Sequence, residues 1–192
     1  MRVTGGTLSG RVLKGPSSQN VRPTSDRLRA AIFNVLAHAY DDAANGARVI
    51  DLFAGTGALG IEAISRGADF ALFVDDSAEG RALVRENIEA LGLGGVTKLF
   101  RRDATKLGPM PPQEPFTLAF LDPPYGHGLG DKALVSLRDG GWLAPQALVI
   151  VEESAAAEID VPAGFEPIER RDYGDTHVLI FRVTENTIPQ NK

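Results

Sequence analysis

Short apolar runs alternate with amphipathic segments along most of this chain. Five runs suit buried strands, because each is short and flanked by turn residues; they lie at 49–53, 70–74, 96–100, 116–121 and 147–151. The segments between them repeat apolar positions at helical spacing over 61–66, 78–91 and 131–138. This alternation of strand and helix predicts an α/β fold with a Rossmann-like, doubly wound and mostly parallel sheet.

Further elements extend this pattern at both ends. Residues 165–173 and 177–183 are expected to form an antiparallel pair, which brings the sheet to seven strands. Thr24 or Ser25 can cap a helix whose apolar face holds Leu28, Ile32, Val35, Leu36 and Ala39. Residues 3–14 alternate around glycines and predict a small β-hairpin or arm outside the core. The expected parts are a basic extension (1–46), a main domain (47–183) and a frayed tail (184–192).

Charge is unevenly divided between these parts. The whole chain has a net charge of −5, yet residues 1–36 hold six basic residues and one acidic residue. A basic extension on an acidic body is expected when one edge of a protein meets nucleic acid. Arg27 and Arg29 are expected to point away from the apolar helix face, toward such a partner. The candidate RNA-binding residues are Arg2, Arg11, Lys14, Arg22, Arg27 and Arg29.

The composition restricts the remaining chemistry. The chain has no cysteine, which excludes disulfides and thiolate metal sites, and its three histidines show no metal-ligand spacing. No stretch is long and apolar enough to cross a membrane. We therefore expect a cytoplasmic monomer that uses no metal and has no membrane partner.

The run at 116–121 ends on Asp122-Pro-Pro-Tyr125. Tandem proline fixes φ at both positions and removes two backbone donors, so the turn is stiff and extended. It leaves the Asp122 carboxylate and the nearby carbonyls as acceptors beside an aromatic ring. A planar base that carries an NH2 group fits such a turn, because the ring can stack on the base while the oxygens accept from the amine. Asp122, Pro123, Pro124 and Tyr125 are the candidate catalytic residues.

A glycine turn follows the first strand of the main domain. Gly55-x-Gly57-x-x-Gly60, with Asp75 twenty residues after Gly55, satisfies the pattern of a dinucleotide site, so an NAD-linked oxidoreductase is one interpretation. Asp51 favours another. A carboxylate beside the glycines disfavours a bound pyrophosphate, whereas it can stabilise the ammonium and sulfonium groups of S-adenosylmethionine.

Acidic residues end four successive strands of the expected sheet, at the carboxyl edge where such sheets bind ligands. Asp51 suits the cationic end of the methyl donor, Asp75 or its neighbour Asp76 suits the ribose, and Asp103 suits the adenine amine. The candidate cofactor-binding residues are Asp51, Phe53, Ala54, Gly55, Thr56, Gly57, Gly60, Asp75, Asp76, Asp103, Ala104 and Asp122.

With these motifs the chain resembles the class I S-adenosylmethionine-dependent methyltransferases that methylate amino groups. It is closely similar to the RsmD family of 16S rRNA (guanine-N2)-methyltransferases, over about residues 1–183. The closer likeness rests on Val3-Thr-Gly-Gly6 with Gly10-Arg11, Arg22-Pro-Thr-Ser-Asp-Arg27 with Phe33-Asn34, and Tyr173-Gly-Asp-Thr176. Ala30 and Asp75 depart from the pattern, because the family usually has Glu at both positions.

The resemblance implies methyl transfer from S-adenosyl-L-methionine to the N2 amine of a guanine in 16S rRNA, within a small-subunit or assembly particle. S-adenosyl-L-homocysteine would be the second product. Three alternatives remain at this point. An adenine-N6 methylase shares the Asp-Pro-Pro-Tyr motif but usually needs a target-recognition domain, and a glutamine methylase usually has Asn at position 122. A non-catalytic RNA-binding assembly factor should have lost one of Asp51, Gly57 or Asp122, and all three are present.

Overall fold

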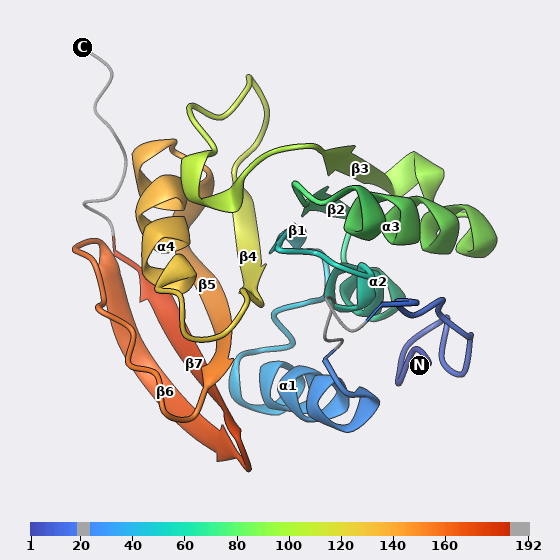
Figure 1. The fold of residues 1–192 in the computed structure, drawn as a ribbon, viewed down its shortest axis with the longest axis horizontal. Helices are drawn as coiled ribbons and strands as arrows, with labels where there is room; N and C mark the ends of the chain where they lie inside the picture. Colours follow the sequence, from blue (N-terminus) through green and yellow to red (C-terminus); the bar gives the residue numbers. More distant parts are fainter. Residues whose placement is uncertain (19–23, 185–192) are drawn as a thin grey trace.

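The computed structural model describes residues 1–18 and 24–184. Its strands form one seven-stranded sheet in the order β3-β2-β1-β4-β5-β7-β6, with helices on both faces (Figure 1). The elements are α1 (Asp26–Ala39), β1 (Arg48–Leu52), α2 (Ala58–Ser65), β2 (Phe70–Val74), α3 (Ala78–Leu91), the 3-10 turn η1 (Gly94–Val96), β3 (Thr97–Phe100), the 3-10 turn η2 (Ala104–Lys106), β4 (Phe116–Leu121), α4 (Leu129–Asp139), β5 (Leu143–Ser154), β6 (Phe165–Tyr173) and β7 (Thr176–Val183).

The first five strands run parallel, and β7 lies antiparallel to both β5 and β6. The sequence therefore correctly predicted a doubly wound sheet of seven strands with an antiparallel carboxyl-terminal pair. β1 pairs with β2 on one side and with β4 on the other, so the chain reverses its direction of winding between β1 and β4. The loops that leave these two strands separate there, which creates the crevice where open α/β sheets bind ligands.

Two apolar clusters, one on each side of the sheet, form the core. α1, α2 and α3 cover one face, where Phe33 of α1 packs on Phe120 of β4 with ring centroids 5.3 Å apart. α4 covers the other face together with Trp142, whose ring stacks on Phe116 at 6.2 Å. Figure 1 shows these helices on opposite sides of the strands. Because both faces are covered, the central strands are made mainly of apolar residues, as their sequences indicated.

The residues at the helix and strand ends explain where these elements begin and end. Ser25, and not Thr24, caps α1, because its hydroxyl accepts from the amide of Leu28 at 3.1 Å. Gly92 ends α3 in the left-handed conformation. β1 ends one residue earlier than predicted, at Leu52, since Phe53 has a φ of 57° and leaves the strand conformation.

The expectation that the N-terminal hairpin lies outside the core is wrong. Its two sides meet in a single antiparallel bridge between Arg2 and Val12. Val3 and Leu13 are buried in the same cluster as α1 and α2, with 2% and 3% of their surfaces exposed. Burial of these two apolar side chains makes the arm part of the fold.

Candidate active site

The carboxyl ends of β1, β2 and β4 open into one pocket of about 630 Å³. Most of the residues that the sequence nominated for the methyl donor and for catalysis line it: Asp51, Phe53, Ala54, Gly55, Thr56, Asp75, Asp76, Ala104, Asp122, Pro123, Pro124 and Tyr125. The nominated residues outside its lining are Gly57, Gly60 and Asp103. Thr24, Glu79 and Arg102 line the pocket as well, and none was predicted to do so.

The glycine turn is held close to the sheet. Phe53 has a φ of 57°, a left-handed conformation that a bulky side chain seldom adopts and that often marks a functional turn. The amide of Gly55 donates to Asp75 Oδ2 at 2.8 Å, which ties the turn to the end of β2. A Cβ at Gly60 would lie 2.4 Å from the ring of Phe73, so α2 can begin this close to the sheet only with glycine there.

Asp51 is a buried carboxyl group in the lining of the pocket. Its side chain is fully buried, and its pKa is raised to about 8, chiefly by burial; the Gly60 amide, which donates to Asp51 Oδ2 at 3.0 Å, limits the rise, and the nearby Asp75 adds to it. At neutral pH this group is mainly a neutral acid. A cation placed beside it in the pocket would favour ionisation, so the site suits a positively charged ligand group.

Asp75 and Asp76 occupy different positions at the end of β2. Asp75 is nearly buried, and besides the Gly55 amide it accepts from the Ser77 amide and hydroxyl at 2.8 and 2.6 Å. Its carboxylate thus joins the glycine turn to the cap of α3. Asp76 is exposed and lines the same pocket. The pairing of either residue with a ribose stays a prediction.

Asp103 caps the short η2 turn. Its Oδ1 accepts from the Thr105 amide at 2.9 Å and from the Thr105 hydroxyl at 2.7 Å, and these hydrogen bonds hold the pKa of Asp103 below its usual value. The residue lines a shallower hollow beside Lys106 and Lys132, next to η2 and α4. The proposed contact between Asp103 and an adenine amine therefore stays a prediction, while its neighbour Ala104 does line the main pocket.

The turn after β4 is anchored through side chains from distant parts of the chain. The Thr24 hydroxyl, just before α1, lies 2.9 Å from Asp122 Oδ2 and 3.0 Å from Glu152 Oε2. The Tyr125 hydroxyl donates to Glu152 Oε1 at 2.6 Å and lies 3.1 Å from the hydroxyl of Thr176. Burial, and then the bond to Glu152, raise the pKa of Tyr125 well above its ordinary value. The ring is thus fixed in orientation at the pocket rim.

Thr24, Glu152 and Thr176 were not nominated as site residues from the sequence. Thr24 was considered as a helix cap, and Thr24 and Thr176 also lie in stretches that carry the family resemblance, but neither was given a role in the site. Glu152 carried a usable signal, because it ends the fifth apolar run just as Asp51, Asp75 and Asp122 end theirs. An acidic residue near the carboxyl end of any parallel strand is a candidate for the ligand site, so Glu152 could have been nominated with the other three.

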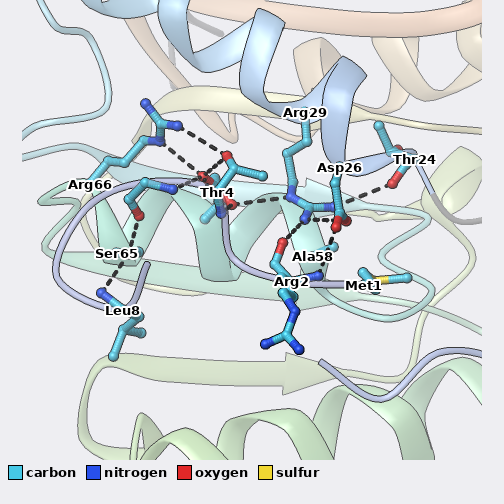
Figure 2. A network of polar contacts seen from close by, with 12 residues as sticks. Met1, Arg2, Thr4, Leu8, Thr24, Asp26, Arg29, Ala58, Ser65 and Arg66 are labelled. Atoms are coloured by element: carbon cyan, nitrogen blue, oxygen red, sulfur yellow. Dashed lines mark hydrogen bonds and ion pairs between the residues drawn. The ribbon is translucent and has the colours of Figure 1, made fainter. Parts of the chain in front are cut away.

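The predicted outward orientation of Arg29 is wrong. Its side chain is fully buried between α1, α2 and the arm, where Nε pairs with Glu62 Oε2 at 3.1 Å and Nη2 with Asp26 at 2.9 Å (Figure 2). It also donates to the carbonyl oxygens of Arg2 and Thr24. A guanidinium buried in this way is unable to contact RNA phosphates.

The other nominated basic residues differ in their surroundings. Arg2, Arg11, Lys14 and Arg27 are exposed. Arg2 and Arg11 donate to the carbonyls of Gly10 and Ala90, and Lys14 pairs with Glu86 on α3. Arg22 lies outside the described residues. Four of the nominated cations are therefore exposed, and RNA docking by the arm stays a prediction.

Glu62 joins the arm, α1 and α2 through its carboxylate. Its carboxylate is fully buried, and it accepts from the Thr4 and Gly5 amides at 3.0 Å each and pairs with Arg66 Nε at 3.0 Å. Two buried or half-buried guanidinium groups therefore compensate its charge. The network fastens the arm and α1 to α2, the helix that follows the glycine turn.

Neither a membrane-crossing helix nor a metal cluster is found in the described residues. Within residues 1–18 and 24–184, no helix has the length and apolar character needed to cross a membrane. The described part of the chain also holds no group of three or more His, Cys, Asp or Glu side chains that could bind a metal ion.

The sheet order, the glycine turn and the acidic strand ends define a class I methyltransferase fold, and solved structures agree. The Escherichia coli protein yhhF superposes with a TM-score of 0.81 at 30% identity, over 96% of this chain and 98% of that one. An RNA methyltransferase from Salinibacter ruber, in complex with S-adenosyl-L-homocysteine, has a TM-score of 0.62 at 15% identity and covers 88% of this chain and 98% of its own. At that identity the second match supports the fold alone.

Sequence comparison assigns the family. Residues 1–182 match the family model described as conserved hypothetical protein 95. Ribosomal RNA small subunit methyltransferase D of Escherichia coli (strain K12) is 38% identical over 153 residues, which are 79% of this chain and 74% of the relative. The Haemophilus influenzae protein of that name is 27% identical over 188 residues, 97% and 94% of the two chains. This chain belongs to the family that this model describes, together with these rRNA methyltransferases, so the resemblance to RsmD methyltransferases is confirmed.

Proposed function

We propose that this chain transfers a methyl group from S-adenosyl-L-methionine to the N2 amine of a guanine in 16S rRNA, in the cytoplasm, on a small-subunit or assembly particle. One observation carries the proposal. The acceptor groups of Asp122 and its prolines line the same pocket as Asp51 and the glycine turn, so a donor and a base amine can meet there. Relatives named as small-subunit rRNA methyltransferases support methylation of this class of RNA.

The donor would lie over the glycine turn. Asp51 would face its ammonium group, Phe53 and Ala104 would flank it, and Asp75 and Asp76 at the end of β2 would face the ribose. S-adenosyl-L-methionine supplies a sulfonium methyl group that a nucleophile can displace. The residues of this chain need only align the acceptor nitrogen with that methyl group and exclude water.

The acceptor would lie against the turn after β4. Tyr125 would stack on the base, which must leave its RNA stack to reach the pocket. The amine would donate to Asp122 and to the Pro123 carbonyl. These bonds would draw the amine lone pair out of conjugation with the ring and toward the donor, which raises its nucleophilicity. This electrostatic alignment accounts for the role of the Asp-Pro-Pro-Tyr turn in transfer.

An adenine-N6 methylase is the second candidate, because the same turn serves any aromatic amine. The product distinguishes the two candidates. We would incubate the protein and S-adenosyl-L-methionine with small-subunit particles from cells that lack this gene, and then identify the methylated nucleoside by mass spectrometry. N2-methylguanosine in 16S rRNA is expected. N6-methyladenosine would favour the second candidate, and no methylated nucleoside would contradict both.

Asp122→Ala tests whether the turn catalyses the transfer. Single-turnover methylation should fall by about 10²-fold or more, the usual loss when one pre-placed transition-state hydrogen bond is removed. The rate of single-turnover methylation by Tyr125→Ala should fall by a comparable amount, since base stacking contributes roughly 1–3 kcal/mol. Both variants should bind S-adenosyl-L-homocysteine like the wild type. Near-wild-type rates in both would remove the turn from the reaction.

A further inference from the structure

The hydroxyl of Thr24 lies between two carboxyl groups. Its Oγ1 is 2.9 Å from Asp122 Oδ2, which faces the pocket, and 3.0 Å from Glu152 Oε2, which is buried. A hydroxyl has one hydrogen and two lone pairs, so it can donate to only one carboxylate at a time. Its lone pairs then face the other carboxylate, and that contact becomes favourable once the second carboxyl group carries a proton. One added proton therefore lets the Thr24 hydroxyl form a hydrogen bond with each of the two carboxyl groups at once.

Methyl transfer to an amine produces such a proton. The amine nitrogen forms its bond to the methyl carbon as the carbon–sulfur bond breaks and that electron pair goes to sulfur. The nitrogen then carries a positive charge and must lose one proton to give the neutral methylated amine. In the proposed complex the basic group beside the nitrogen is Asp122, and a protonated Asp122 would accept more weakly from the remaining N–H group than its ionised form does.

We propose that Thr24 relays this proton from Asp122 to Glu152; the three residues are called the Thr24 relay below. Asp122 takes the proton from the nitrogen, the Thr24 oxygen accepts it from Asp122 Oδ2, and the Thr24 hydrogen passes to Glu152 Oε2. Atoms and charge balance, because one proton leaves the nitrogen and one arrives on Glu152. Asp122 is again ionised and holds the product amine. This inference rests on the proposed amine methylation.

The surrounding structure keeps the Thr24 relay in place. Arg29 Nη1 donates to the Thr24 carbonyl at 3.3 Å, and Figure 2 shows this contact between the two residues. On the far side, Tyr125 donates to Glu152 Oε1 at 2.6 Å, so the two carboxylate oxygens of Glu152 face different hydroxyl groups. Thr24 has only 6% of its surface exposed and Glu152 only 5%, which shields the transferred proton from bulk water.

Other charged groups lie close enough to influence the titration. Glu153 follows Glu152 on β5 and accepts from the Gly126 amide at 3.3 Å. His177 on β7 pairs with Glu153 in the sheet register, and burial lowers the pKa of this histidine. Among the described residues, the charged or titratable groups around the relay include Arg29 on α1, Tyr125 after β4, Glu153 on β5, His177 on β7, and Asp51 and Asp75 across the pocket.

A set of matched variants tests the relay by single-turnover methylation across pH. Thr24→Val keeps the shape and loses the hydroxyl, Thr24→Ser keeps the hydroxyl, and Glu152→Gln removes the proton acceptor. Thr24→Val and Glu152→Gln should be slower by at least about tenfold, should show a changed pH profile, and should regain rate with rising concentrations of a small buffer acid–base pair such as imidazole. Thr24→Ser should stay within about threefold of the wild type with its pH profile. Donor binding and thermal melting identify any variant that misfolds.

Thr176→Val is the control, because it removes a hydroxyl beside Tyr125 but lies outside the relay. It should show neither buffer rescue nor a changed pH profile. Equal losses in Thr24→Ser and Thr24→Val, or losses without any change in pH profile or buffer response, would overturn the relay. Both outcomes require a wild-type protein that is active. If the proposed function is wrong, the wild type itself forms no methylated amine, so the two failures can be distinguished.

Discussion

The pKa of Asp51 makes donor binding dependent on pH. Without ligand, burial raises this pKa to about 8. A cation within about 4–6 Å lowers the pKa of a carboxyl group by roughly 1–3, so Asp51 should titrate near pH 5–7 in the complex. Binding then releases a proton between these two pKa values. Because a pKa that is lower by one in the complex makes binding to the ionised form about tenfold tighter, and unliganded Asp51 is only about half ionised at pH 8, affinity should rise by roughly 5- to 250-fold from pH 5 to pH 8.

The sign of the effect follows from linkage. The ligand binds the ionised form of Asp51 more tightly, so raising the pH toward 8 strengthens binding. An α-amino group has a pKa of about 8, so the ligand loses its own charge above that value and binding weakens again. The expected profile is bell-shaped with a maximum near pH 8. Unliganded Asp51→Asn should also resist unfolding better than the wild type above pH 8, because the raised pKa lowers wild-type stability as pH rises from about 4 to 8.

Calorimetry of S-adenosyl-L-homocysteine binding between pH 5.5 and 7.5 measures the effect, in two buffers of different ionisation enthalpy so that proton release is counted. Asp51→Asn should bind more weakly at pH 7.5 and show a flat profile. 5′-Methylthioadenosine, which lacks the ammonium group, is the matched ligand and should show little pH dependence with the wild type. A wild-type affinity that is independent of pH over this range would refute the pairing of Asp51 with the ammonium group.

Two further predictions concern the first helix. Arg29→Met leaves Glu62 with one guanidinium partner and should lower the free energy of unfolding in urea by about 3–5 kcal/mol. The control Arg138→Ala breaks a surface ion pair and should lower it by less than about 1 kcal/mol. Equal effects of the two variants would contradict a structural role for the buried pair. Arg27→Ala should weaken RNA binding and reduce its salt dependence by roughly one phosphate contact, measured by filter binding, whereas the exposed Arg85→Ala on α3 should do neither. An unchanged salt slope for Arg27→Ala would remove that residue from the RNA surface.

The central sheet was predictable because its strands are buried on both faces. The runs 70–74 and 116–121 became β2 and β4 with no change of boundary, since each is continuous apolar sequence bounded by turn residues. Parallel pairing then places the residue after each strand at one edge. This geometry is why Asp75 and Asp122, which follow β2 and β4, and Asp51, which lies in the last residues of β1, could be assigned to one pocket from spacing alone.

The orientation of α1 was not predictable in the same way. Its buried residues are Arg29, Ile32, Phe33 and Leu36, a helical stripe with an arginine at its start. The sequence interpretation chose the neighbouring stripe from Leu28 because apolar residues recur along it at helical spacing, which left Arg29 on the outer face. The cation is compensated by Glu62, and that pairing is a tertiary contact 33 residues distant in the chain. Helical periodicity carries no information about such a partner.

The polar network around Glu62 also changes how the role of the arm should be tested. Thr4 and Gly5 of the arm donate to Glu62, Glu62 pairs with Arg29, and Arg29 holds the carbonyl of Thr24, whose hydroxyl contacts Asp122. Removing the arm would leave a buried carboxylate short of two amide donors and would remove the contacts of Val3 and Leu13 in the core. A truncated protein would therefore lose catalytic geometry together with any RNA contact. Single charge changes at exposed positions leave this network intact, so they separate docking on RNA from alignment of the catalytic turn.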